Sequence, residues 1–520
     1  MDSSKPSNEA DVLIVGLGPV GASFAAFCGL LGLRVIAVER DTEIYKNPRA
    51  VQIDHEILRQ VEMIDVADQV LAASRPSKGY EFVSKDRDIL VSRSRTDLAP
   101  TQYPYNNMFH QPTFEKALRE RLATMPEVST HLGCELVALE QSSDHVTASI
   151  KTAGGQEQTI VSRFVVGCDG GRSFVRKSLG VEMHDLGFDE PWLVVDVKLA
   201  DGVEALTNKG TQLCDPQRPT TSTPSGPGRH RWEFMLNPDD NPDEVTQPVS
   251  IMKRIAEWVD PDSVTLERNA VYRFHGLVAQ QWRKDRVMII GDAAHQMPPF
   301  MGQGLCSGVR DATNLAWKLA AVIEDQASPA LLDSVITERS PHVTSITESA
   351  IELGRLVCIR DPQQAEARDK QIKADQLAGK APPFPLMPNI INGVLSDDAA
   401  GQIMPEPLIN DAKRLDAETG YVPIMIVRDS SNLDQNDMEG VTAFLHSSPN
   451  ARLCCLNGSQ ASFIQVLDSD GHLSTMMEGA DALIAKPDRI VFGKGQISDL
   501  AQQWHAYLQG EQFIQASQTN

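Results

Sequence analysis

The sequence predicts an α/β protein with a doubly wound, largely parallel sheet, an interleaved domain on a second sheet, and a small C-terminal α/β domain. Two observations predict this architecture. Residues 11–15 and 34–38 are short apolar runs on either side of an apolar helical stretch, the strand–helix–strand order of a parallel sheet. After about residue 405, strand-like and helix-like segments alternate afresh, which indicates a separate domain.

The turn after the first strand is rich in glycine. It reads Gly16-Leu17-Gly18-Pro19-Val20-Gly21, and the second strand ends at Glu39. Gly16 permits the tight turn, Gly18 lets the backbone approach a pyrophosphate, and Gly21 lets the helix pack on the strand. The helix N-terminus attracts phosphate, and Glu39 can accept hydrogen bonds from ribose hydroxyls. The segment predicts a dinucleotide site without distinguishing FAD from NAD.

Two later segments add detail to this site. Residues 163–176, RFVVGCDGGRSFVR, place an Asp-Gly turn after a short apolar strand. Residues 286–318 place Gly291-Asp292 after another strand. Prolines stiffen the loop that follows, and glycines give its backbone conformational freedom before a helix begins at about Leu305. One face of that helix is apolar, which core packing explains. The Gly-rich turn before it is suited to holding an anion.

The segments between these motifs predict the second sheet and the limits of the domains. Runs at 191–199, 229–235 and 271–277 predict strands of the second sheet, and the Pro-, Ser- and Thr-rich residues 215–228 predict a long loop. We expect a discontinuous first domain (8–185 and 280–345), a sheet domain (186–279), a helical arm and linker (346–404, with Pro-rich 381–388) and a C-terminal domain (405–520).

The composition limits which kinds of partner the chain can bind. The chain has 48 basic and 70 acidic residues, and a net charge of −22 makes it a poor match for nucleic acid or an anionic membrane. No apolar stretch reaches the length of a membrane helix, and the first residues, MDSSKPSNEA, do not resemble a signal peptide. The eight cysteines show no CxxC or metal-ligand spacing. We expect a cytoplasmic protein with reduced cysteines and no metal site.

The segments GCDGGRSFVR (167–176) and GDAAHQMPPFMGQGLCSGVRDATNLAWKL (291–319) strongly resemble the class A flavoprotein monooxygenases, the p-hydroxybenzoate hydroxylase group. Within that group the chain is most similar to the 3-(3-hydroxyphenyl)propionate hydroxylases, over roughly residues 10–410. The resemblance implies a Rossmann-like FAD-binding domain, an interleaved mixed β-sheet substrate domain and a C-terminal thioredoxin-like domain. Because the redox CxxC is absent, we expect the last domain to serve packing or dimerisation in a homodimer.

The resemblance also implies site residues. Asp169 would serve both FAD and NAD(P)H, and Gly171-Arg172 departs mildly from the Ala-Arg of many relatives. The other expected cofactor-binding residues are Gly16, Gly18, Pro19, Val20, Gly21, Glu39, Arg40, Arg49, Gln111, Asp292, Pro299, Gly302, Gly304, Leu305 and Cys306. Pro299 would lie near the reacting edge of the flavin, and the amides of Leu305 and Cys306 would point at flavin O2.

The expected function is aromatic hydroxylation. The resemblance implies noncovalent FAD, reduction by NAD(P)H, and dioxygen activated as a flavin C4a-hydroperoxide that hydroxylates a phenol. On the second sheet, Tyr272 and His275 are the expected polar groups beside the phenol, His275 because histidine titrates near neutrality. The alternative is that His275 is a structural strand residue. Arg231 is a candidate for a substrate carboxylate, although arginine is common on exposed strands.

The sequence alone leaves other functions open. Another flavin enzyme on the same fold, such as a reductase, epoxidase or oxidase, fits the same motifs, and a non-catalytic flavin-fold binding protein fits them less well. The sequence names neither the phenol nor the choice between NADH and NADPH.

Overall fold

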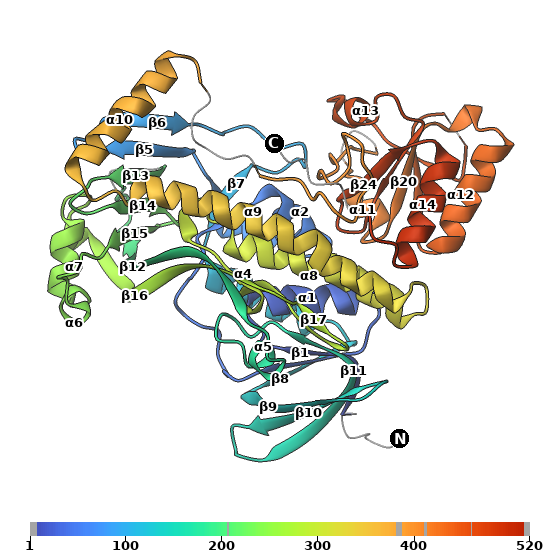
Figure 1. The fold of residues 1–520 in the computed structure, drawn as a ribbon, viewed down its shortest axis with the longest axis horizontal. Helices are drawn as coiled ribbons and strands as arrows, with labels where there is room; N and C mark the ends of the chain where they lie inside the picture. The colour runs from blue at the N-terminus through green and yellow to red at the C-terminus, as the bar shows by residue number, and fades with distance from the viewer. Residues whose placement is uncertain are drawn as a thin grey trace.

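The computed structural model describes residues 8–204, 207, 209–380, 387–409, 413–458 and 460–513 (Figure 1). Most of the expected Pro-rich linker, 381–386, lies outside these residues. Among the described helices, none is long and apolar enough to cross a membrane.

The first sheet carries the dinucleotide motif. Its strands run in the order β17-β18-β11-β1-β2-β8, and all neighbours from β18 to β8 are parallel. The bounds are β1 (Glu9–Val15), β2 (Val35–Glu39), β8 (Val128–Leu132), β11 (Glu157–Gly167), β17 (Arg283–Lys284) and β18 (Val287–Ile289). Two further strands, β9 (Cys134–Gln141) and β10 (Val146–Thr152), pack on one face. The helices α1 (Pro19–Leu30), α4 (Gln111–Leu122) and α8 (Gly304–Ile323) cover the other face.

The second sheet has the strand order β19-β16-β12-β15-β14-β13-β5-β6. Its strands are β19 (His295–Gln296), β16 (Val264–Ala279), β12 (Met183–Leu199), β15 (Arg229–Met235), β14 (Thr220–Pro224), β13 (Gly210–Cys214), β5 (Tyr80–Ser84) and β6 (Ile89–Arg93). The strands predicted at 191–199, 229–235 and 271–277 are confirmed. The loop predicted at 215–228 is wrong in part, because it contains β14, whose threonines suit a strand once β13 and β15 flank it. Strands β5 and β6 join this sheet from within the range expected for the first domain.

The two faces of the second sheet have different surroundings. We call the face that packs under α6 (Pro242–Val245) and α7 (Pro248–Ile255) the outer face, and its core includes Leu193, Trp232 and Ile251. The opposite, inner face packs against Phe300, which follows Pro299 in the glycine-rich loop before α8. The inner face is therefore the one that adjoins the motif loops.

Small elements link the two sheets. A three-stranded sheet joins β3 (Gln52–Asp54), β7 (Asn106–Phe109) and β4 (Ser74–Pro76), and beside it lie α2 (His55–Glu62) and α3 (Ala67–Ala72). The short α5 (Phe174–Ser178) follows β11, and the long α9 (Asp333–Val357) and α10 (Pro362–Leu377) follow α8. Figure 1 shows α9 crossing the molecule, with α10 beside β6. Helix α10 lies within residues 346–404, where a helical arm and linker were expected.

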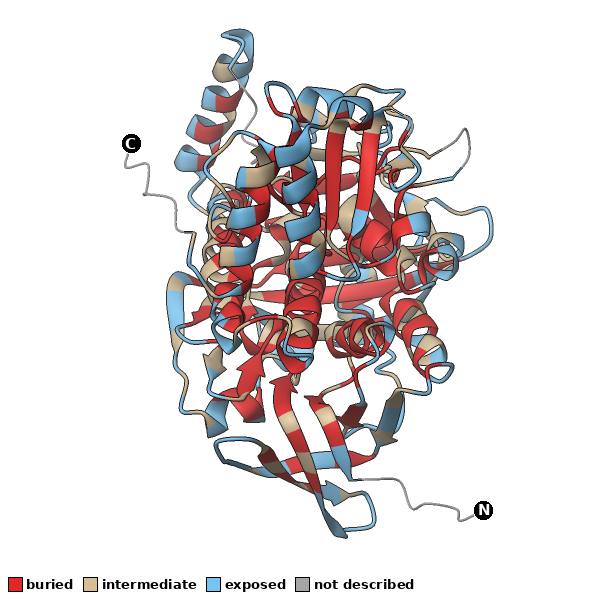
Figure 2. Cartoon of the chain, turned by 90° about the vertical axis from the view of Figure 1, so that its right-hand side faces the viewer, coloured by how far each residue is buried: buried red, intermediate tan, exposed pale blue. Residues whose placement is uncertain are grey.

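The helix predicted from Leu305 is confirmed, but it is buried on more than its apolar face. Arg310, Asp311, Asn314 and Lys318 are all buried, and each has a charged or hydrogen-bonding partner. Figure 2 shows the continuous buried interior into which such elements pack.

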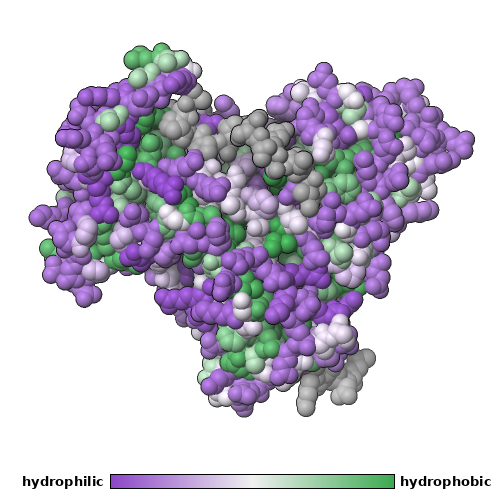
Figure 3. All heavy atoms as spheres, viewed as in Figure 1, coloured by the Kyte–Doolittle hydropathy of each residue, from purple (hydrophilic) through white to green (hydrophobic). Residues whose placement is uncertain are grey.

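The C-terminal domain is a five-stranded sheet in the order β22-β21-β20-β23-β24. Its strands are β20 (Ile424–Asp429), β21 (Arg452–Asn457), β22 (Ile464–Gln465), β23 (Ala482–Ala485) and β24 (Val491–Gly495), and its helices are α11 (Asp416–Thr419), α12 (Gln435–Ser447), α13 (His472–Met476) and α14 (Ile497–Leu508). The apolar spacing of Ile497, Leu500, Ala501, Trp504 and Leu508 predicts a helix over 497–508, and α14 confirms it. Strand β23 was not predicted. The face shown in Figure 3 is mostly hydrophilic over this domain.

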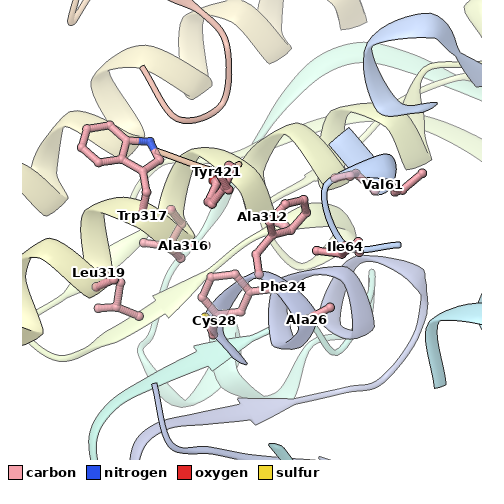
Figure 4. Close-up of a cluster of buried hydrophobic side chains, with 14 of the residues drawn as sticks. Phe24, Ala26, Cys28, Val61, Ile64, Ala312, Ala316, Trp317, Leu319 and Tyr421 are labelled. Carbon is pink, nitrogen blue, oxygen red and sulfur yellow. The ribbon is translucent and has the colours of Figure 1, made fainter. Parts of the chain in front are cut away.

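The C-terminal domain packs directly on the first domain. The ring of Tyr421 lies 4.7 Å from that of Phe27 in α1, and its hydroxyl donates to the carbonyl of Thr313 in α8. Figure 4 shows Tyr421 in a buried cluster with Ala316 and Trp317 of α8. Trp317 of α8 stacks on Trp504 of α14 with ring centroids 6.0 Å apart. These contacts make α8 a shared core element of both domains.

Candidate active site

Three motif loops meet at one edge of the first sheet. The strands β18, β11 and β1 are parallel neighbours, and each ends in a motif: Gly291-Asp292, Gly167–Asp169 and Gly16–Gly21. Backbone bonds join the loops, from Ile290 N to Gly167 O (3.1 Å) and from Cys168 N to Val15 O (2.7 Å). Ligands of doubly wound sheets bind outside the carboxyl ends of the strands, which is where these loops lie.

In the glycine turn, one position has room for a side chain and two do not. Gly16 has a φ of +98°, and a Cβ there would lie 2.6 Å from the carbonyl oxygen of Cys168. A Cβ on Gly21 would lie 1.9 Å from the carbonyl oxygen of Gly16, whereas a Cβ on Gly18 would meet nothing within 4 Å. Gly16 and Gly21 are therefore required by the protein itself, and Gly18 leaves free the space that a pyrophosphate approaches.

The start of α1 is prepared for an anion. Pro19 occupies its first turn, no side chain caps the helix, and the first turn has no acidic residue. Val20 packs against Gly291 and Gly308, either of which would bring a Cβ within 3.1 Å of its methyl groups. The N-terminal N–H groups of the helix are thus left to a phosphate rather than to a protein carboxylate.

Glu39 organises the turn as well as facing the site. Its Oε2 accepts from Leu17 N at 2.8 Å and its Oε1 accepts from Asp41 N at 3.0 Å. Each carboxylate oxygen can accept a further bond, so the group remains able to bind a ribose hydroxyl. The next residue, Arg40, has a side chain that is 70% exposed and lies 3.6 Å from Asp41.

Asp169 fixes the second loop. Its carboxylate accepts from the Ser173 hydroxyl at 2.5 Å and from the amides of Phe174 and Val175 at 2.7 and 3.0 Å. The nearby Arg176 donates to Gly171 O and to Ala293 O, so this guanidinium ties the second loop to the third. We did not predict Arg176, although it stands in the recognised segment at 167–176.

Arg49 and Asp292 meet across the site. Their side chains are 59% and 46% exposed, with Nη1 and Oδ2 4.0 Å apart. Gln111 lies beneath them, because its Oε1 accepts from the amides of Arg49 and Ala50 at 2.9 and 2.7 Å. Its Nε2 donates to Glu115, whose pKa is raised by burial. Gln111 therefore positions the segment that carries Arg49.

The loop before α8 forms the opposite wall. Pro299–Met301 is a 3-10 turn that ends at Gly302, where φ is +64° and a Cβ would lie 3.3 Å from the side chain of Gln52. Helix α8 then begins at Gly304 with no side-chain cap and no acidic residue in its first turn. Leu305 and Cys306 are buried in that turn. An uncapped helix start of this kind stabilises a nearby anion.

Tyr272 lies on the inner face of the second sheet. It pairs in register with Trp192, whose ring lies 5.7 Å from that of Phe300. The guanidinium of Arg268 lies 4.8 Å from the Tyr272 ring, and the Tyr272 hydroxyl helps to lower the pKa of Tyr45. Tyr272 therefore lies on the face of the sheet that adjoins the loop of Pro299.

His275 lies on the outer face. It is three positions from Tyr272 with no register shift between them, so the alternation of a strand directs the two side chains to opposite faces. Its Nδ1 lies 3.3 Å from Asp189 Oδ1, and the Asp189 carboxylate also binds Arg273, which shares that face. The expectation that His275 is the base beside the phenol does not fit this geometry.

Arg231 is not available to a substrate carboxylate. It is buried, its Nε and Nη2 bind Asp196 at 2.7 and 2.9 Å, and its Nη1 and Nη2 donate to the carbonyls of Arg49 and Pro48 at 2.6 and 2.5 Å. Arg268 adds further bonds to Asp196 and Pro48. The expected substrate ligand is instead a clamp on the segment that carries Arg49.

Tyr45 was not predicted and lies beside Tyr272. The Asn47 amide donates to its hydroxyl at 3.5 Å. This bond, the Tyr272 hydroxyl and the positive charges of Arg268 and Arg49 lower the pKa of Tyr45 despite some burial. No sequence pattern marks Tyr45 as a site residue, because only the fold brings residues 45 and 272 together.

The geometry fits FAD. An open glycine faces an uncapped helix start, a carboxylate stands at the end of β2, and a second uncapped helix start lies behind Pro299, as a dinucleotide with an anionic ring system requires. Within the described ranges, no group of three or more His, Cys, Asp or Glu residues could hold a metal ion.

Comparisons with known proteins agree with this geometry. The family model described as "FAD binding domain" matches residues 9–350. The chain is 35% identical over 492 residues to a probable NADH-specific resorcinol 4-hydroxylase of Rhodococcus jostii (strain RHA1), covering 93% of this chain and 91% of the relative. It is 30% identical over 516 residues to the 3-(3-hydroxy-phenyl)propionate/3-hydroxycinnamic acid hydroxylase of Escherichia coli O139:H28 (strain E24377A / ETEC), covering 93% and 92%.

Solved structures share the fold. The flavin-dependent monooxygenase PieE, in complex with FAD and substrate, matches with a TM-score of 0.81 at 19% identity, over 98% of this chain and 100% of that chain. The OxyS anhydrotetracycline hydroxylase from Streptomyces rimosus matches with a TM-score of 0.77 at 22% identity, over 97% and 99%. At this identity the likeness concerns the fold alone.

Proposed function

This chain belongs to the family of FAD-dependent aromatic hydroxylases, the class A flavoprotein monooxygenases, and on that premise we propose how its loops and second sheet divide the work. The protein is a single-component monooxygenase that uses FAD to hydroxylate a phenolic aromatic substrate. The division of roles among its residues is our proposal.

One observation carries the proposal. Three loops far apart in sequence converge at the carboxyl edge of β18, β11 and β1, and the inner face of the second sheet adjoins the fourth, at Pro298–Gly302. A cofactor extended along the three loops would bring its ring to that fourth loop. A substrate on the inner face would then meet the ring.

The cofactor residues bind in order along this path. The amides at the start of α1, with Gly18, hold the pyrophosphate, and Glu39 accepts from a ribose hydroxyl. Arg49 and Asp292 flank the middle of the cofactor. Bound FAD supplies hydride acceptance from the nicotinamide and activation of dioxygen. The amides of Leu305 and Cys306 stabilise negative charge on the ring, and the buried surroundings of Phe300 exclude water.

On the substrate side, Tyr272 contacts the phenol, and Tyr45 lies close enough for the Tyr272 hydroxyl to lower its pKa. Pro299 packs at the reacting edge of the ring. We also propose NADH as reductant, on the name of the 35% identical relative. Asp169 orders the loop that this reductant approaches.

The C-terminal domain is proposed to be a thioredoxin-like scaffold. Its central parallel pair, β20 and β21, with antiparallel β23 and β24 alongside, suits that arrangement. No CxxC is present in the sequence, so its role is packing on α8 and contact in a homodimer.

The test is reconstitution. The purified protein, loaded with FAD, is supplied with NADH and a series of phenols, and NADH and oxygen consumption are followed with product mass. Substrate-stimulated consumption and a product heavier by one oxygen atom are expected. Flavin reduction with no hydroxylated product from any phenol would contradict the proposal and favour a reductase or oxidase on the same fold.

A further inference from the structure

One buried carboxylate on the inner face has no hydrogen-bond donor. Glu233 is on β15, and its side chain is 8% exposed. Within the described part of the chain it accepts no hydrogen bond, and its nearest charged partner is Arg231, with Oε1 and Nη1 3.8 Å apart. Buried carboxylates are nearly always hydrogen-bonded, so this one is prepared for a donor that is not part of the protein.

The neighbours of Glu233 form a continuous line toward the flavin loop. In register across β15 and β14 it faces Thr221, whose hydroxyl donates to Gln212 Oε1 at 2.8 Å on β13. Gln212 Nε2 donates to the Tyr80 hydroxyl at 2.5 Å on β5, and Tyr80 donates to the carbonyl of Phe300 at 3.4 Å. Every other member of this line has a hydrogen bond, so Glu233 is the member left to bind a ligand.

The cations near Glu233 are already balanced. Arg231 and Arg268 carry two positive charges, and both bind the carboxylate of Asp196. With Glu233 added, the four groups sum to no net charge. A carboxylate on the substrate would add one unbalanced negative charge beside Glu233, where burial gives little screening.

We propose that Glu233 accepts a hydrogen bond from a substrate hydroxyl, and that this site selects an uncharged arene bearing a second hydroxyl group over a phenolic acid. This inference rests on the proposed function and deepens it. Burial raises the pKa of Glu233, against the effect of Arg231, which reflects how poorly the ion is solvated without a donor. A substrate hydroxyl supplies that donor, and an apolar arene fits the surrounding Trp192, Met235 and Phe300.

The test compares two probes, resorcinol and 3-(3-hydroxyphenyl)propionate, in the FAD-loaded enzyme. Dissociation constants come from titration calorimetry, and kcat and KM from NADH consumption with product analysis. We expect the wild type to favour resorcinol at least tenfold in kcat/KM. In Glu233→Gln the KM and Kd for resorcinol should rise about tenfold, and the discrimination against the acid should shrink, because the repelling charge is gone.

A matched control lies on the same sheet. Glu81 is on β5 and faces the other way, bound to Thr211 and 3.6 Å from Lys209. Glu81→Gln should leave both probes within twofold of the wild type. FAD content and melting temperature confirm that each variant is folded.

Two outcomes would overturn the inference while leaving the proposed function intact. One is hydroxylation of the acid at least as efficient as that of resorcinol. The other is a folded Glu233→Gln enzyme with unchanged Kd and KM for resorcinol. Failure to hydroxylate any phenol would instead contradict the proposed function itself.

Discussion

The guanidinium of Arg231 and the carboxylate of Asp196 form a two-bond pair across β15 and β12, with distances of 2.7 and 2.9 Å. The same guanidinium binds the carbonyls of Pro48 and Arg49. One buried pair thus connects the second sheet to the segment that lies along the cofactor path. The position of Arg49 depends on a side chain 182 residues away.

Replacing Arg231 by lysine should weaken FAD binding. Lysine keeps the charge but lacks the planar fork, so it cannot hold Asp196 and both carbonyls together. We expect the FAD Kd to rise about tenfold, equivalent to ~1.4 kcal/mol, by fluorescence titration. Arg229→Lys, at the start of the same strand and paired with Glu267, should bind FAD as the wild type does. An unchanged FAD Kd in a folded Arg231→Lys protein would show that the clamp does not position the segment.

Substitutions of two glycines in the turn should have different effects, one on FAD binding and the other on folding. Gly18→Ala should leave the melting temperature of the apoprotein unchanged, because φ is −65° and the new methyl meets nothing, yet it should weaken FAD binding at least tenfold. Gly21→Ala should prevent stable folding, because the methyl would overlap the Gly16 carbonyl. Gly154→Ala, in a surface turn with only the Thr152 hydroxyl nearby, is the control. Normal FAD affinity in Gly18→Ala would argue against the pyrophosphate position.

Tyr272 and His275 should differ in their effect on hydroxylation. Tyr272→Phe removes a hydroxyl on the inner face, and we expect kcat/KM for the phenol to fall about tenfold, within the range of a lost hydrogen bond. His275→Ala acts on the outer face and should stay within twofold of the wild type. Oxygen and NADH consumption, with product quantified, measure both. A large loss of coupled hydroxylation in His275→Ala alone would reverse the assignment.

Glu406 should make stability depend on pH. Burial and the neighbouring Asp416 raise its pKa from 4.5 to about 8, and both its oxygens lack hydrogen-bond partners in the described structure. Between these pH values the unfolded chain releases this proton while the folded protein keeps it, so stability falls as pH rises from 4.5 to 8.

Removing the carboxyl group of Glu406 tests the predicted direction of this pH dependence. Glu406→Gln should raise the free energy of unfolding by about 2 kcal/mol at pH 8 and by much less at pH 5. Denaturant unfolding at the two pH values measures the difference, with the exposed Glu418→Gln as control. A variant that is less stable than the wild type at pH 8 would contradict the prediction.

The local motifs were readable in the sequence because short-range geometry imposes them. Gly16, Gly18 and Gly21 are spaced by the demands of one turn and one helix start, and the Asp-Gly pairs at Asp169 and Asp292 end apolar strands in the same way. The apolar periodicities of α8 and α14 likewise predicted those helices. Strand β14 escaped prediction because its residues, TTSTP, favour a strand only when flanked by partner strands.

The sequence by itself determined the dinucleotide turn, the order of the motifs and the alternation of the main strands, because each depends on neighbours within a few residues. Only the tertiary structure decided which face of the second sheet meets the cofactor. That choice placed Tyr272 inside and His275 outside, turned Arg231 into a clamp, and left Glu233 without a donor. Such roles depend on contacts between residues distant in sequence, and no local pattern encodes them.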